Sequence, residues 1–168
     1  FKSILGRLFW TYAIILMLVF TSVAVTVGIF VNHFAISTHM NNVISVSQNL
    51  EYWTGSLQIE DTDYRARAAY KQLLRSWGSF LNSDIIVTNS NGEVLESTTS
   101  SATVPDELVH IVTNGNIVKK YSTLNGSYKN KMMVIGVPIK YQGGIVGASF
   151  YVTGIFDIRK TTLELFMM

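Results

Sequence analysis

The side chains that most often carry out chemistry in proteins are sparse in this sequence, and their spacing forms no reactive group. The chain has three histidines, at positions 33, 39 and 110, and no cysteine. His33 and His39 are six residues apart, which on a helix separates them by about 240° and prevents them from sharing one metal ion. The sequence also lacks a G-x-S-x-G nucleophile motif and a glycine-rich phosphate loop. We therefore expect no catalytic residue, no metal site and no cofactor within these 168 residues.

Polar residues inside otherwise apolar segments are the remaining candidates for a binding site. One lies on a predicted helix and three lie on predicted strands: Arg75, Tyr121, Lys131 and Tyr151. Each could contact a small ligand, but a structural role is the favoured interpretation for each. A domain that binds no small molecule is a further alternative.

One apolar stretch determines how the chain is organised. Residues 8–31 contain no charged side chain. As an α-helix this stretch spans about 36 Å, enough to cross a hydrocarbon core of about 30 Å. A cleaved signal peptide has a shorter apolar region, of about 7–15 residues, followed by small residues at the cleavage site. Neither feature fits here, so we predict an uncleaved transmembrane helix.

The flanks of this stretch predict its orientation. Lys2 and Arg7 precede it, and short flanks rich in Lys or Arg stay in the cytoplasm. We expect residues 1–7 in the cytoplasm, 8–31 in the membrane and 32–160 outside the cytoplasm. The net charge of +2, without a basic cluster interleaved with aromatic residues, argues against binding to nucleic acid. The chain begins with Phe rather than Met, so we expect a fragment of a longer protein.

A helix is predicted to continue beyond the membrane, because neither Pro nor Gly occurs between Asn32 and Thr54. Ser47 and Thr54 occupy two steps of a heptad-like repeat along this helix. The apolar steps form a candidate dimer seam: Ile36, Met40, Val43 and Leu50. The stripe either packs on its own domain or also pairs with a second copy in a homodimer, and the two interpretations are compatible. We expect the helix to break between Gly55 and Asp63.

An amphipathic pattern predicts a second helix from Tyr64 to Leu81. Its apolar residues recur at i, i+3, i+4 and i+7, and they include Trp77 and Phe80, which we expect to pack on a sheet. The opposite face is polar and is expected to be solvated, apart from the candidate ligand residue Arg75. That face consists of Arg65, Arg67, Lys71, Gln72 and Arg75.

After Asn82 the period of the apolar pattern falls from 3.6 to 2, which predicts strands. The expected strands cover 84–88, 93–97, 116–124, 131–140 and 145–153, with a short helix over 105–114. The last two strands are the most apolar and should be central. Pro138 has no N–H, so it should face an unpaired edge or a bulge. Residues 155–168 are predicted to be helical, with 161–168 beginning a second transmembrane helix.

Three motifs in the second half point to a known fold: DIIVTNSNGEV at 84–94, VIGVPI at 134–139 and GGIVGA at 143–148. With the order of elements, they resemble the extracytoplasmic PAS-like sensor domain, also called a single Cache or PDC domain, of bacterial two-pass sensor histidine kinases. The likeness covers about residues 32–160. It implies an α+β fold, with a PAS-like five-stranded antiparallel sheet flanked by a long N-terminal helix continuous with the transmembrane helix.

The resemblance also implies signalling across a membrane. A small molecule or protein outside the cytoplasm would change the helices that enter the membrane, and a kinase module beyond this segment would act on a response regulator. The same architecture serves chemoreceptors and cyclic-di-nucleotide enzymes, and a membrane-anchored adaptor without output is another alternative. Citrate-binding members carry an Arg-x-x-His pattern, but Gly78 stands three residues after Arg75. No ligand residue is therefore carried over from the family.

The predicted topology can be tested by labelling intact cells. A cysteine introduced at Ser90 should react with a membrane-impermeant maleimide, because residues 32–160 are expected outside the cytoplasm. A cysteine introduced at Ser3 should react only after the cells are lysed. Labelling of position 3 together with protection of position 90 would reverse the orientation.

Overall fold

The computed structural model describes residues 4–59, 64–100 and 103–154, and it forms two compact units, Phe1–Ser37 and Thr38–Met168. Helix α1 (Ile4–Ile59) belongs to both units and is uninterrupted. Among the described residues, α1 is the one helix that is long and apolar enough to cross a membrane. The predicted exit helix at 155–168 lies outside the described residues.

The first unit presents apolar side chains all round the helix. Its large hydrophobic residues from Leu8 to Phe30 are more than half exposed, as expected for side chains that contact lipid rather than protein. The hydroxyls of Thr11, Thr21 and Thr26 donate hydrogen bonds to backbone carbonyls four residues earlier. These polar groups are therefore satisfied within the helix itself, which a hydrocarbon environment requires.

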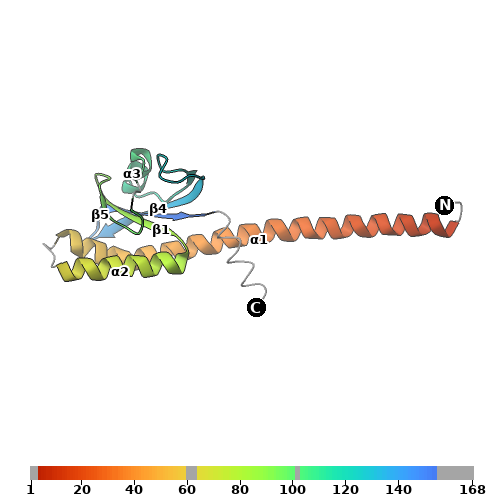
Figure 1. The fold of residues 1–168 in the computed structure, drawn as a ribbon, viewed down its shortest axis with the longest axis horizontal. Helices are drawn as coiled ribbons and strands as arrows, with labels where there is room; N and C mark the ends of the chain where they lie inside the picture. The colour runs from red at the N-terminus through yellow and green to blue at the C-terminus, as the bar shows by residue number, and fades with distance from the viewer. Residues whose placement is uncertain (1–3, 60–63, 101–102, 155–168) are drawn as a thin grey trace. The chain divides into compact units, whose positions relative to one another are not determined.

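The second unit is built on a five-stranded antiparallel sheet (Figure 1). Along the chain, α1 is followed by α2 (Tyr64–Leu81), β1 (Asp84–Asn89), β2 (Val94–Ser97), α3 (Asp106–Thr113), β3 (Val118–Ser122), β4 (Met132–Tyr141) and β5 (Gly144–Thr153). The strand order is β2-β1-β5-β4-β3. The predicted fold class, α+β with a PAS-like five-stranded antiparallel sheet preceded by a long helix, is confirmed. The two most apolar strands, β4 and β5, lie inside the sheet, also as predicted.

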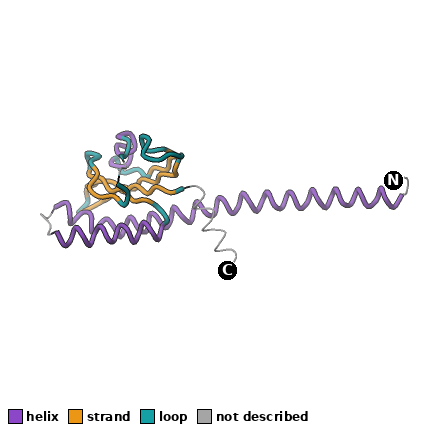
Figure 2. The backbone as a smooth tube through the Cα atoms, in the orientation of Figure 1, coloured by secondary structure: helices purple, strands orange, loops and turns teal. Residues whose placement is uncertain are grey.

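The two faces of the sheet are covered by different helices, as the ribbon and tube views agree (Figure 2). Because side chains alternate along a strand, neighbouring residues of β5 point to opposite faces. Phe150 and Val152 belong to an apolar cluster with Leu108 and Val112 of α3. Ser149 and Thr153 instead form hydrogen bonds with residues of α1. The face toward α3 thus carries the apolar cluster, whereas the face toward α1 includes polar contacts with the helix.

Local sequence features explain the turns and edges of the sheet. Gly92 and Gly143 adopt φ values of 88° and 84° in the turns after β1 and β4, a region that glycine enters without steric cost. Pairing between β3 and β4 stops at Gly136, which pairs with Val118. Pro138 therefore lies where that side of β4 has no partner strand, and its missing N–H costs no ladder hydrogen bond.

One expectation about the helices was confirmed and one was wrong. Helix α1 ends at Ile59, inside the predicted interval Gly55–Asp63, although it passes through Gly55 itself. Gly55 is buried because it packs against the ring of Tyr141, so this glycine allows close contact instead of ending the helix. Phe80 does not pack on the sheet, since 69% of its surface is exposed, and Trp77 is half-buried with its ring edge-on to Phe80. The buried stripe of α2 consists of Tyr70, Leu74, Gly78 and Leu81.

A matched pair of phenylalanines tests this assignment of the core. Phe150→Ala should lower the free energy of unfolding by about 3–5 kcal/mol, because it opens a cavity under α3. Phe80→Ala should change it by no more than about 0.5 kcal/mol, since an exposed ring leaves no cavity. Urea unfolding of the full chain in detergent micelles measures both values. Equal losses for the two variants would show that α2 packs on the sheet differently from this description.

Candidate functional site

The contact between α1 and the sheet contains a series of buried polar pairs. His39 Nε2 lies 3.1 Å from Thr153 Oγ1, and Ser47 Oγ lies 3.2 Å from Ser149 Oγ. Farther along α1, Thr54 Oγ1 lies 2.6 Å from the hydroxyl of Tyr70 on α2. Residues 39, 47 and 54 are eight and seven positions apart, so they share one side of the helix. Ser47 and Thr54, the polar positions of the heptad-like repeat, thus form hydrogen bonds within this chain.

Burial changes the protonation of three groups near this contact. It lowers the pKa of His39 below its ordinary value of 6.5, because the protonated ring is poorly solvated there. It raises the pKa of Tyr70 to about 12, although the hydrogen bond with Thr54 opposes part of the rise. It raises the pKa of Tyr151 to about 12 as well, against the smaller influence of the nearby Ser149 and Ser47 hydroxyls. All three groups are therefore neutral at pH 7.

Tyr151 is the one buried side chain among the described residues whose polar atom lacks a partner with hydrogen-bond geometry. Its surface is fully covered. Burial raises the pKa of Tyr151, and the hydroxyls of Ser149 and Ser47 are close enough to lower it in part, so Tyr151 belongs to the polar part of the contact between α1 and β5.

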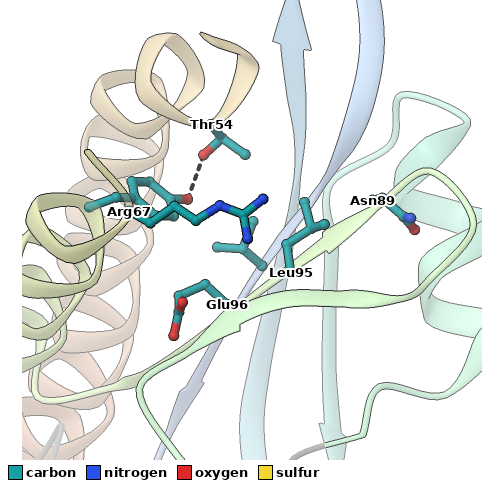
Figure 3. Close-up of a pocket in the computed structure, with 7 residues that line it drawn as sticks. Thr54, Arg67, Asn89, Leu95 and Glu96 are labelled. Atoms are coloured by element: carbon teal, nitrogen blue, oxygen red, sulfur yellow. Dashed lines mark hydrogen bonds between the residues drawn. The ribbon is translucent and has the colours of Figure 1, made fainter. Parts of the chain in front are cut away.

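A pocket of about 360 Å³ lies where the end of α1 meets α2 and the first two strands. Figure 3 shows Arg67 reaching from α2 across this pocket toward Leu95 of β2, with Glu96 beside it. The hydrogen-bonded pair of Thr54 and Tyr70 forms another part of the wall. The lining residues are Thr54, Arg67, Tyr70, Val87, Asn89, Leu95 and Glu96. The pocket combines a cation, hydroxyls and apolar side chains, which suits a small polar ligand with an apolar part.

Two more hollows adjoin this pocket along α2. One, of about 690 Å³, lies between Lys71 and Arg75 of α2 and the residues of β2 and the loop that follows it. The other, of about 370 Å³, is lined by Arg75, Asp84 and the chain between the end of α2 and β1. Among the described residues, no group of three or more potential metal ligands lies close enough to bind a metal ion.

The structure separates the four residues that sequence analysis nominated for ligand binding. Arg75 is exposed and lines both of these neighbouring hollows. Tyr121 is 46% exposed on β3, which is the other edge strand of the sheet. Lys131 is exposed just before β4, and Tyr151 is buried in β5. The four residues do not surround one cavity, and only Arg75 lines any of the hollows described here.

The four residues of the candidate dimer seam differ in burial. Val43 and Leu50 are fully buried, and Ile36 and Met40 are half-buried. The side chains of Val43 and Leu50 are thus occupied within this chain. Pairing of two copies through the seam stays a prediction.

Sequence reasoning missed several residues of the pocket. The sequence places Arg67 on a solvated face of the predicted helix 64–81 and Thr54 in the heptad-like repeat. One signal in the sequence could have found the site: Arg67, Lys71 and Arg75 recur every four residues and so lie on one side of α2. The partners on β1 and β2 could not be found in this way, since they depend on the tertiary contact.

Comparison with known proteins finds no matching family model and no matching curated protein. Among solved structures, the chain is similar to the sensor domain of the Vibrio cholerae histidine kinase DctB, with 9% identity over 76% of this chain and 56% of that chain, at a TM-score of 0.47. It is also similar to the ligand-binding domain of the Campylobacter jejuni chemoreceptor Tlp3 in complex with L-valine, with 13% identity over 76% of this chain and 60% of that chain, at a TM-score of 0.44.

A third similar structure is the ligand-binding domain of the Pseudomonas aeruginosa amino acid chemoreceptor PctC in complex with GABA, with 11% identity over 76% of this chain and 62% of that chain, at a TM-score of 0.47. This chain therefore spans about three fifths of the length of these structures. At such identities and TM-scores, the similarities assign no ligand and no activity to this chain. The predicted resemblance to PAS-like sensor domains is confirmed at the level of the fold, by the long helix and the five-stranded antiparallel sheet.

The buried position of His39 predicts a dependence of stability on pH. Because the pKa of His39 is lowered in the folded chain, the unfolded chain binds a proton first as the pH falls. The stability contributed by neutral His39 is therefore present above about pH 6.5 and is lost as the pH falls through the lowered pKa. Urea unfolding at about pH 7.5 and about pH 5.5 should show this loss.

Two substitutions identify the group responsible. His39→Gln should remove most of this loss, because no titrating ring remains between α1 and β5. His110→Gln should leave it intact, since His110 is exposed on α3. A pH dependence that is the same in both variants and in the unchanged chain would contradict the assignment to His39.

Proposed function

We propose that this chain is the sensing region of a transmembrane receptor, and that helix α1 carries the signal. The observation that supports the proposal is the continuity of α1. The same helix contains the uncharged stretch 8–31 and, farther along, residues that form hydrogen bonds with the strand β5. A displacement of the sheet against this helix would therefore act on the membrane span without passing through a flexible linker.

The nature of the contact between α1 and β5 supports this role. A receptor needs an element with two arrangements of similar free energy, one of which the signal favours. The contact contains hydroxyl and imidazole pairs beside the buried apolar residues Val43 and Leu50. Short hydroxyl groups can exchange partners after a small shift, whereas interlocked apolar side chains resist sliding because they must first separate. We infer that the signal alters the position of α1 along β5.

For the output, we propose a histidine kinase module that follows this region, and a response regulator as its intracellular partner. The proposal follows from the motifs at 84–94, 134–139 and 143–148, which resemble the sensor domains of two-pass kinases. A chemoreceptor or a cyclic-di-nucleotide enzyme would use the same sensing region. The membrane is then the first partner of the chain, with residues 32–160 outside the cytoplasm and a small molecule or protein as the signal.

We further propose that the receptor is a homodimer, with two copies pairing near the membrane. Ile36 and Met40 are the seam residues whose side chains are only half-buried, so they keep apolar surface for such pairing. Val43 and Leu50 would then hold α1 to its own sheet while the earlier positions contact the second copy. The apolar stripe of α1 would thus pair with the second copy near the membrane and pack on its own sheet farther along the helix.

The contact between α1 and β5 provides a direct test of the proposed function. Ser47→Ala removes the hydrogen bond with Ser149 and should shift basal phosphorylation of the full-length receptor several-fold, because it changes the balance between the two arrangements. Membranes that contain the receptor are incubated with labelled ATP, and phosphohistidine is recognised by its lability to acid. Ser45→Ala is the matched control, since Ser45 is exposed on the same helix.

The outcomes separate the parts of the proposal. Phosphohistidine that shifts with Ser47→Ala and not with Ser45→Ala supports a kinase controlled through α1. Phosphohistidine that is identical in both variants and the unchanged receptor would contradict the role of α1. A receptor that forms no phosphohistidine itself but stimulates a separate kinase would contradict the histidine kinase and support a chemoreceptor.

A further inference from the structure

Three cations form a row along α2. Arg67, Lys71 and Arg75 are all exposed and are separated by four residues each. With a rise of about 1.5 Å per residue, successive members of the row are about 6 Å apart along the helix, and the row is about 12 Å long. Arg65 lies on the same helix and is also exposed, but it lines none of the hollows beside the row. The three cations of the row therefore line the hollows beside α2, whereas Arg65 does not.

The edge of strand β2 lies opposite this row of cations. It is the terminal strand of the sheet and pairs with β1 alone among the described strands. Successive side chains of a strand point to opposite faces. Nevertheless, every residue from Val94 to Thr98 lines the same hollow beside Lys71 and Arg75. The hollow therefore runs along the edge of β2 and not over one face of the sheet.

The hollows form one continuous groove. The pocket beside Arg67 shares Leu95 and Glu96 with the hollow beside Lys71. That hollow shares Arg75 and Thr98 with the next one. We call this the α2–β2 groove, with Arg67, Lys71 and Arg75 on one wall and residues 94–98 on the other.

The charge of the groove is positive along the row. Among the described residues, the acid that faces the row is Glu96, whose Oε1 lies 3.1 Å from Lys71 Nζ. Asp84 lines the far hollow beyond Arg75, where its carboxylate accepts a hydrogen bond from the Tyr128 hydroxyl. Among the described residues, Arg67 and Arg75 form no ion pair. Two cations at the ends of the row are thus available to an anionic partner, and the central one is shared with Glu96.

We propose that the α2–β2 groove binds an extended acidic peptide, which adds to the free edge of β2 and places carboxylates at alternate positions on Arg67, Lys71 and Arg75. In an extended chain with a rise of about 3.3 Å per residue, alternate side chains are about 6.6 Å apart, close to the spacing of the cations. A five-residue peptide with acidic side chains at positions one, three and five therefore matches the spacing of the three cations. Backbone pairing with β2 would give affinity, and the cations would select the acidic pattern.

The free edge favours a peptide over other polyanions. Backbone N–H and C=O groups at an unpaired edge strand bind another strand, and they provide no comparable advantage to a phosphate polymer. The Ser and Thr residues that follow β2 add hydroxyl donors and acceptors to the same wall. The proposal goes beyond the receptor function, because peptide binding is measured on the chain itself and needs no output module. Either proposal can therefore fail while the other stands.

The test compares two peptides of the same composition, Glu-Ala-Glu-Ala-Glu and Glu-Glu-Glu-Ala-Ala, each capped at both ends and labelled with a fluorophore. The full chain is placed in nanodiscs of zwitterionic lipid, and binding is followed by fluorescence anisotropy. The alternating peptide should bind saturably and at least threefold more tightly than the block peptide. Inorganic tripolyphosphate, which carries similar charge without a peptide backbone, should compete only weakly.

Substitutions locate the binding in the groove. Arg67→Gln and Arg75→Gln should each weaken the alternating peptide about tenfold, the loss expected for one charge-assisted hydrogen-bonded pair. Arg65→Gln is the matched control on the same helix and should leave the affinity unchanged. Glu96→Gln should strengthen binding, because it removes the acid that competes for Lys71.

Three results would overturn the proposal. The first is an absence of saturable binding by the alternating peptide. The second is equal weakening by Arg65→Gln and Arg67→Gln, which would indicate a diffuse attraction to the basic helix. The third is equal affinity for the two peptides together with strong competition by tripolyphosphate, which would assign the groove to polyanions in general.

Discussion

The second unit depends on how one side of α1 packs against β5. This contact has to satisfy polar groups that are wholly or partly buried, and it does so in pairs, His39 with Thr153 and Ser47 with Ser149. Each pair contributes only modestly to stability, but each buried group left alone would cost more than the pair provides. The register of helix and strand is therefore specified by polar complementarity, while Val43, Val46 and Leu50 of the same helix are buried apolar residues.

The division of the sheet into two unlike faces follows from this contact. Toward α3 the core is apolar, and a shift there would require interlocked side chains to separate. Toward α1 buried apolar residues such as Ile85 and Ile135 lie beside hydroxyl pairs, whose partners can exchange after a small shift. We propose that a change at the edge of the sheet reaches the uncharged stretch 8–31 through this mixed face. The α2–β2 groove lies at that edge and also contacts α1 through Thr54.

Much of the fold was predictable from the sequence, and most of the candidate site was not. An uncharged run of 24 residues, a change of period after Asn82 and turn residues at Asn89–Gly92 and Gln142–Gly143 are local signals, and they located the helices and strands closely. Phe80 was misread because its environment depends on tertiary contacts, which leave this apolar residue exposed. The groove was missed for the same reason, since the edge of β2 and the cations of α2 meet only in the folded chain.

The central claim is that α1 must change its position against β5 for a signal to reach the membrane. The 168 residues contain no cysteine, so a receptor with Ser47→Cys and Ser149→Cys introduces a single reversible link between these two neighbouring positions. Oxidation should fix the output of the full-length receptor at one level, and reduction should restore its response. If oxidised and reduced receptors give the same output and the same response while the disulfide is shown to form, α1 does not need to move against β5 and the account is wrong.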